Sequence, residues 1–251
     1  MKICLQKYSL LFFFTLLIYS CKTSYVVKEY AATTQKVNAE LASNSPTIDS
    51  IIAPYKKSLD AEMNRVLVVN EKAISKHGGE SELGNLLADI TYQKAIKYGK
   101  QPVDFAIVNL GGIRIPQLPA GDITLGKVYE LMPFDNAIVI VELNGNETKQ
   151  FFDIMAKEGG IPIANAKYTI KDGKAIDIFI NGVELTESSN YKIALSDYLA
   201  NGGDNLSLFI GKKQIATNKL LRDAFIEAFE ELGSRNKTIK IAKEGRVSFS
   251  K

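Results

Sequence analysis

The sequence predicts an α+β fold in a single domain, and three observations point to it. From Pro46 to Lys251 the apolar content stays high over about 200 residues, which suits one domain with a sizeable core. Segments with helical periodicity and runs typical of strands follow one another in mixed order, not in strict alternation. The turn sequence Lys171-Asp172-Gly173-Lys174 lies between two strand-like runs and indicates a hairpin. A doubly wound parallel sheet is therefore disfavoured.

The individual elements follow from the spacing of apolar residues. Apolar side chains recur every three or four positions in four segments, which predicts helices over residues 48–59, 83–96, 147–157 and 220–232. Short runs rich in β-branched and aromatic residues predict strands over residues 66–69, 105–108, 137–141, 168–170, 176–180, 191–195 and 247–249. The sequence contains no internal repeat.

The N-terminus has the pattern of an export signal. Lys2 and Lys7 accompany an apolar run over residues 10–18, and small Ser20 directly precedes Cys21. The run is too short to span a bilayer comfortably. We therefore predict a lipoprotein signal peptide over residues 1–20 and lipidation of Cys21, which would anchor an exported protein to a bacterial membrane on its periplasmic or surface side. An ordinary secretory signal that happens to lie beside Cys21 is the alternative.

The composition changes after the leader. Residues 21–45 are mostly small and polar, which predicts a flexible tether, and residues 46–251 form the predicted domain. Cys4 lies in the segment that would be removed, so Cys21 would be the only cysteine left and no intramolecular disulfide could form.

The charge distribution argues against a nucleic-acid polymer as ligand. The chain has 31 basic and 28 acidic residues, and loss of Lys2 and Lys7 with the leader leaves 29 basic residues and a net charge of +1. Basic and acidic residues are interspersed, without a basic run that could follow a phosphate backbone. A small anionic ligand remains compatible, because one pocket needs only local charge.

Three short motifs carry the residue types of a nucleotide pocket. In the stretch 109–114 two glycines are followed by Ile113 and then by Arg114. The stretch 132–136 contains Phe134. The stretch 198–204 begins with Tyr198 and ends with two glycines and Asp204. Glycine permits close approach of the backbone, arginine binds phosphate, aromatic rings stack on a base and a carboxylate accepts ribose hydroxyls. The alternatives are a surface ion pair for Arg114, a core position for Phe134 and a turn-forming role for Asp204.

Together with the segment Glu80–Asp89, these motifs resemble the C-terminal, substrate-specificity domain of the periplasmic 5'-nucleotidase, UDP-sugar hydrolase and 2',3'-cyclic phosphodiesterase family. The resemblance runs from about Val66 to Phe249 and keeps the motifs in family order. It implies layered sheets flanked by helices in an α/β/β/α arrangement. It also implies a nucleotide or nucleoside ligand, whose binding residues would be Arg114 at the phosphate, Phe134 and Tyr198 at the base, Asp204 at the ribose, and Asn109, Gly112, Asn136 and Gly203 around them.

The sequence departs from the family pattern at several positions. Tyr198 occupies a position that is usually phenylalanine, so its hydroxyl is expected to alter base preference, and Asn205 stands where a further glycine is usual. Arginines that hydrolytic members place before the Glu80–Asp89 motif are missing, and the stretch 70–79 offers Lys72, Lys76 and His77 instead. Glu80 and Ser81 are interpreted as structural residues, with Ser81 as a helix N-cap, and Asp89 is interpreted as a solvated or structural carboxylate.

Family members pair this domain with an N-terminal metallophosphatase domain that holds two metal ions. This chain has one histidine, His77, and no Asp-x-His pattern, so we predict no catalytic residue, metal or cofactor within it. The leading hypothesis is the nucleotide-recognition half of a split extracytoplasmic 5'-nucleotidase, which works with a separate metallophosphatase subunit. A non-catalytic nucleotide- or nucleoside-binding lipoprotein is the alternative, and a degenerate module that serves only in protein contacts is a third possibility.

Overall fold

The computed structural model describes residues 32–34 and 46–250. Contacts divide the chain into two units, Met1–Asp49 and Ser50–Lys251, and all the sheets belong to the second. The signal peptide predicted over residues 1–20, Cys21 and nearly all of the tether predicted over 21–45 lie outside the described residues. Helix α2 (Pro46–Met63) forms where the spacing of its isoleucines predicts a helix, and it buries none of its residues.

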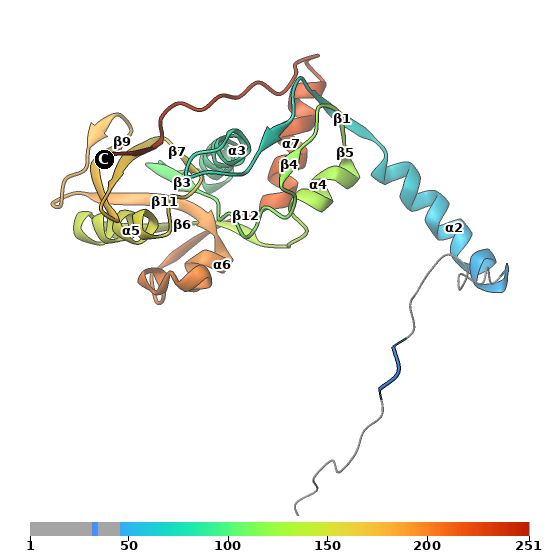
Figure 1. Ribbon diagram of the computed structural model, residues 1–251, viewed down its shortest axis with the longest axis horizontal. Coiled ribbons are helices and arrows are strands. Elements are labelled where there is room, and N and C mark those ends of the chain that lie inside the picture. The colour runs from blue at the N-terminus through green and yellow to red at the C-terminus, as the bar shows by residue number, and fades with distance from the viewer. Residues whose placement is uncertain (1–31, 35–45, 251) are drawn as a thin grey trace, which may run out of the picture. The chain divides into compact units, whose positions relative to one another are not determined.

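A five-stranded mixed sheet forms the centre of the domain (Figure 1). Its order is β12-β6-β11-β3-β7, with β6 antiparallel to both β12 and β11, β3 parallel to β11, and β7 antiparallel to β3. The strands are β12 (Gln214–Leu220), β6 (Ala137–Asn144), β11 (Asn190–Ser196), β3 (Phe105–Ile107) and β7 (Ile163–Ala164).

Both faces of the middle of this sheet are buried, which explains why β3, β6 and β11 contain continuous apolar runs in the sequence. Successive side chains of a strand point to opposite faces. In β6, Ile138 and Ile140 accordingly join one hydrophobic cluster, whereas Val139 and Val141 join another. The sheet therefore separates two cores.

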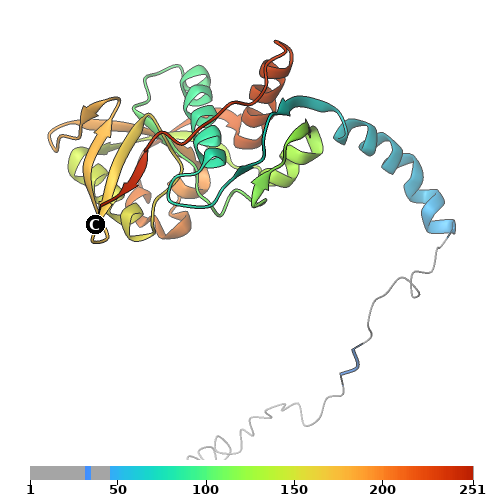
Figure 2. The same ribbon diagram turned by 45° about the horizontal axis from the view of Figure 1, so that its top comes forward.

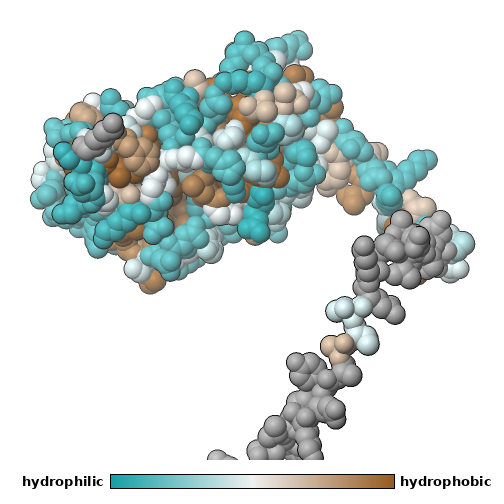
Figure 3. Space-filling view, viewed as in Figure 1, coloured by the Kyte–Doolittle hydropathy of each residue, from teal (hydrophilic) through white to brown (hydrophobic). Residues whose placement is uncertain are grey.

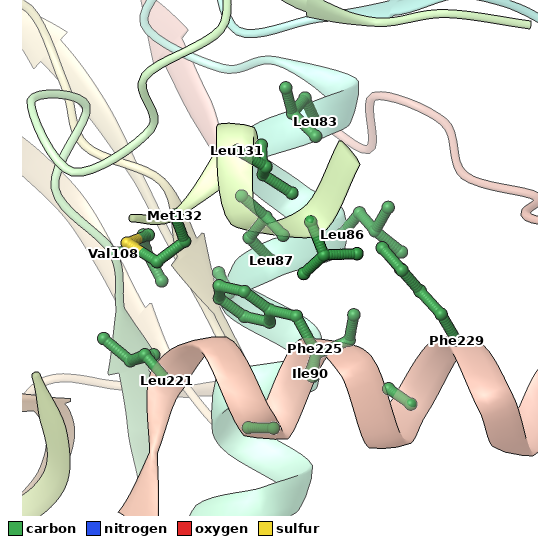
Figure 4. Packing of buried hydrophobic residues seen from close by; sticks show 14 of the residues in the cluster. Leu83, Leu86, Leu87, Ile90, Val108, Leu131, Met132, Leu221, Phe225 and Phe229 are labelled. Carbon is green, nitrogen blue, oxygen red and sulfur yellow. The ribbon is translucent and has the colours of Figure 1, made fainter. Parts of the chain in front are cut away.

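The first core lies between the sheet and helices α3 (Glu82–Gly99) and α7 (Leu221–Gly233). Figure 4 shows Leu83, Leu87 and Ile90 of α3 on the side of the helix that faces Phe225 and Phe229 of α7. Helix α4 (Leu125–Leu131) closes this core, and beside it β1 (Val66–Asn70) pairs with β5 (Gly121–Thr124) and β2 (Ile74–Ser75) with β4 (Gln117–Leu118).

The second core lies between the other face of the sheet, helix α5 (Gly145–Lys157) and a four-stranded sheet. Aromatic rings dominate it: Phe152 of α5 lies 5.5 Å from Phe105 and 5.1 Å from Tyr168, measured between ring centroids. The four-stranded sheet has the order β10 (Val183–Glu184), β9 (Lys174–Ile180), β8 (Ala166–Lys171) and β13 (Val247–Phe249).

The segment after α7 runs across the domain and ends in β13 (Figures 1 and 2). Its Ile239 amide donates to the carbonyl of Val69 at 3.0 Å, and β13 pairs in parallel with β8. Buried Arg246 makes a two-pronged ion pair with Asp89 of α3, with N···O distances of 2.6 and 2.9 Å. This segment therefore links the two cores, and of the solvated and structural roles considered for Asp89 the ion pair supports the structural one.

The fold confirms the predicted α+β class with helices flanking the sheets. Each predicted helix and strand is present, although α7 begins at Leu221. The structure adds α4, the short helix α6 (Asp197–Ala200) and the strands β2, β4, β5, β7, β10 and β12, which the sequence analysis did not predict.

Hydrophilic residues cover most of the face shown in Figure 3, with hydrophobic residues visible between them. Of the helices in the described part of the chain, none combines the length and the apolar character that a membrane span requires.

Candidate functional site

Three separate segments meet around a cavity of about 290 Å³. The segments are the loop after β3, the entrance to β6 and the short helix α6 that follows β11. The cavity is lined by Asn109, Gly111, Gly112, Arg114, Phe134, Asn136, Tyr198 and Asp204. Seven of the eight predicted binding residues thus line this cavity. The eighth, Gly203, is not in the lining but contacts the Tyr198 ring from behind, and Gly111 lines the cavity without having been predicted.

The loop after β3 is a tight turn that depends on Gly112. The Gly112 amide donates to the Asn109 carbonyl at 3.1 Å, and a Cβ at position 112 would lie 2.8 Å from Asn109 Oδ1. Lys76 supports the same loop, because its Nζ donates to the carbonyl of Ile113 at 2.6 Å. Lys76 therefore stabilises the loop and does not line the cavity.

Arg114 leaves this loop with an exposed guanidinium. Its Nη1 donates to the Gly111 carbonyl at 3.3 Å, and its Cζ lies 5.5 Å from the centroid of the Phe134 ring. Within residues 46–250 Arg114 has no carboxylate partner, so the surface ion pair considered from the sequence is not formed. Its charge is available to an anion in the cavity.

Phe134 lies at the entrance to β6 and is 37% exposed, so it is not a core residue. Its backbone is held by Arg222 of α7, whose Nη1 donates to the Phe134 carbonyl at 3.3 Å and whose Nη2 pairs with the Asp135 carboxylate. Sequence analysis missed Arg222, which follows Phe134 by 88 residues and carries no local signal.

Tyr198 belongs to α6 and is 45% exposed toward the cavity. A Cβ at Gly203 would lie 2.5 Å from two atoms of the Tyr198 ring, so the ring rests directly on the glycine backbone. Gly203 therefore acts from behind the ring, and any side chain at this position would displace it.

Asp204 lines the cavity and is held there by two hydrogen bonds. Its Oδ2 accepts from Asn109 Nδ2 at 2.7 Å and its Oδ1 from the Tyr198 hydroxyl at 2.8 Å. Asp204 and Asn205 both have left-handed backbone, with φ of 52° and 61°. Asparagine and aspartate tolerate this conformation better than other non-glycine residues, which explains why Asn205 can stand where glycine is usual.

The remaining residues singled out from the sequence, Lys72, His77 and Ser81, do not line the cavity. Lys72 pairs with Glu82 at 2.6 Å, and His77 is exposed outside the cavity lining. Ser81 caps α3 by accepting from the Gly84 amide at 3.0 Å, as predicted.

Glu80 is a buried structural carboxylate. Burial raises the pKa of Glu80, but hydrogen bonds from the Asn85 amide and from backbone N–H groups of the C-terminal segment outweigh it, so this pKa lies below its ordinary value. Among residues 32–34 and 46–250, no group of three or more His, Cys, Asp or Glu side chains is arranged to bind a metal ion.

A family model of the 5'-nucleotidase C-terminal domain matches residues 62–210. The chain belongs to this family. Cell wall protein Lmo0130 of Listeria monocytogenes is 27% identical over 239 residues, which cover 84% of this chain and 30% of that protein. A 5'-nucleotidase of Vibrio cholerae is 30% identical over 133 residues, which cover 50% of this chain and 22% of that enzyme.

The fold of this 5'-nucleotidase C-terminal domain is also found in solved structures. The 5'-nucleotidase precursor from Thermus thermophilus superposes with a TM-score of 0.68 at 24% identity, over 81% of this chain and 43% of that one. The chain thus spans less than half the length of each of these three proteins. The family resemblance inferred from the motifs is confirmed.

Proposed function

We propose that this 5'-nucleotidase C-terminal domain recognises the nucleotide for an extracytoplasmic 5'-nucleotidase. The observation that carries the proposal is the cavity itself, which combines a free guanidinium, two exposed aromatic rings and a fixed carboxylate. In this proposal the base stacks against Phe134 and Tyr198, the ribose hydroxyls donate to Asp204, and Arg114 binds the phosphate.

Hydrolysis needs a partner in this proposal. Attack on a phosphate ester requires an activated hydroxide, which nucleotidases of this kind obtain from two metal ions. We propose that a separate metallophosphatase subunit holds these metals and that the present chain presents the nucleotide to it. The residues of this chain would bind and orient the substrate and leave the bond cleavage to the partner.

The first test compares the purified chain with and without a metallophosphatase subunit. Phosphate release from AMP is measured with manganese, zinc or cobalt present, and the chain alone is expected to give none. Ordinary enzymatic turnover by the pure chain would contradict the proposal that a separate subunit carries out the hydrolysis. Binding of AMP without any activity in the presence of metallophosphatase candidates would favour a binding lipoprotein. Absence of AMP binding at millimolar concentration would favour a module for protein contacts.

We further propose export and lipid anchoring through Cys21. The N-terminal pattern supports this location, and a relative that carries the name of a cell wall protein is consistent with it. Cys21→Ser is expected to abolish membrane association, because acyl chains would supply the anchor. Membrane fractionation and the mass of the N-terminal peptide test this, and a processed variant that stayed in the membrane fraction would contradict it.

A further inference from the structure

The Tyr198 hydroxyl makes two hydrogen bonds to one residue. It donates to Asp204 Oδ1 at 2.8 Å, and it accepts from the backbone N–H of Asp204 at 3.3 Å. A phenol has a single proton to donate, so this hydroxyl has no donor left for a nucleotide base. The expectation that the hydroxyl alters base preference therefore cannot depend on donation of its proton to the base.

The same two bonds close a tight loop. Between Tyr198 and Asp204 the chain turns through Gly202, with a φ of 93°, and reaches Asp204 in left-handed conformation with a φ of 52°. Such conformations persist only where surrounding contacts determine them. Here the contacts are the Tyr198 hydroxyl on one side of the carboxylate and Asn109 on the other.

We propose that Tyr198 is a positioning residue for Asp204, and that through this bond the cavity selects ribonucleosides over deoxyribonucleosides. The inference rests on the proposed function, since it assigns a substrate class to the same cavity. A carboxylate that is already fixed can accept a ribose hydroxyl without a further loss of side-chain freedom. An analogue that lacks the hydroxyl loses this charge-assisted hydrogen bond to the exposed carboxylate and is therefore bound more weakly.

Tyr198→Phe tests the inference, because it removes the hydroxyl and keeps the stacking ring. Titration calorimetry with adenosine, 2'-deoxyadenosine, 3'-deoxyadenosine and free adenine measures stacking and ribose recognition separately. We expect adenine affinity to stay unchanged and adenosine affinity to fall about tenfold, equivalent to about 1.4 kcal/mol. The preference for adenosine over both deoxynucleosides should fall by the same factor.

Tyr191→Phe is the matched control. The Tyr191 hydroxyl also binds a single residue through its backbone, accepting from the Thr186 amide at 2.9 Å, but it lies outside the cavity lining. This variant should lose a comparable hydrogen bond and keep the wild-type preference for ribose. Asp204→Asn is the second variant; it should lower the preference whether or not position 198 carries a hydroxyl.

The outcomes separate the two proposals. If Tyr198→Phe keeps the wild-type ratio of adenosine to deoxyadenosine affinity while Asp204→Asn lowers it, the positioning role is overturned and the proposed function stands. If Tyr191→Phe lowers the ratio as much as Tyr198→Phe, the effect is general and the positioning role is overturned. If the wild-type protein binds neither adenosine nor AMP, the proposed function fails and this inference fails with it.

Discussion

The two charged side chains in the cavity lining are held in different ways, and the part of the lining around Asp204 is called here the fixed end and the part around Arg114 the free end. At one end the Asp204 carboxylate accepts from Tyr198 and Asn109 at 2.8 and 2.7 Å. At the other end Arg114 has one long contact to the Gly111 carbonyl at 3.3 Å and lies beside the Phe134 ring. The difference teaches that this fold fixes the carboxylate end in advance and leaves the cationic end free to adjust.

This division has a thermodynamic consequence for binding. Ordering a long arginine side chain costs up to about 2 kcal/mol of conformational entropy, and the Arg114 end would incur this cost when an anion binds. The Asp204 side chain, by contrast, is already ordered by its hydrogen bonds in the folded domain. We therefore expect the nucleoside part of a nucleotide to supply most of the affinity of the isolated chain.

The largest expected effect comes from truncating the ring at the fixed end. Tyr198→Ala removes both a stacking ring and the bond to Asp204, so adenosine binding should weaken by about 3 kcal/mol, whereas Phe134→Ala should cost about 1 kcal/mol. Titration calorimetry measures both. Phe249→Ala, which truncates an aromatic side chain that is 64% exposed on β13, is the control and should have no effect. A greater loss for Phe134→Ala than for Tyr198→Ala would reverse the comparison.

An intermediate effect is expected at the free end. Arg114→Ala should weaken AMP binding by about 2 kcal/mol, because a charge-assisted hydrogen bond to phosphate is lost. Adenosine binding should stay unchanged, since adenosine presents no phosphate. Arg114→Lys keeps the charge but not the two-pronged geometry, and should recover part of the loss. Equal losses for AMP and adenosine would show that Arg114 serves the loop and not the phosphate.

The smallest effect on AMP affinity is expected from changing Lys76, which supports the loop that carries Arg114. Lys76→Met removes the bond from Nζ to the Ile113 carbonyl, which should weaken AMP binding by about 0.5 kcal/mol through a looser Arg114. Lys72→Met is the matched control, because Lys72 pairs with Glu82 at the surface, away from the cavity. Competition titrations with adenosine and AMP resolve the difference, and identical behaviour of the two variants would count against the support given by Lys76.

Residue types in local motifs account for what could be predicted about the cavity. The glycine turns, the arginine, the aromatics and the aspartate stand close together within each motif, so the sequence indicated which residues would line the cavity. Arg222 and the supporting contact of Lys76 could not be found in this way. The two side chains act on backbone carbonyls 88 and 37 residues distant in the chain, and no local pattern reports such contacts.

The fold shows the same limit. Strands with both faces buried were predicted from their apolar runs, whereas β12 is largely polar and exists because it pairs with the edge of β6. Helix α4 did have a signal, since Thr124 caps it by accepting from the Lys127 amide and Leu125, Val128 and Leu131 follow at helical spacing. Its short length made this pattern easy to miss.

The C-terminal segment also sets when the domain can be completed during synthesis. Ile239 belongs to the first core and Val247 to the second, and β13 is the last strand of the domain in chain order. Until β13 has been synthesised, one edge of β8 has no partner and Asp89 lacks its arginine. The residues of α3, the central sheet and α7 all precede β13 in the chain, so the domain can be completed only after residue 249 has emerged from the ribosome.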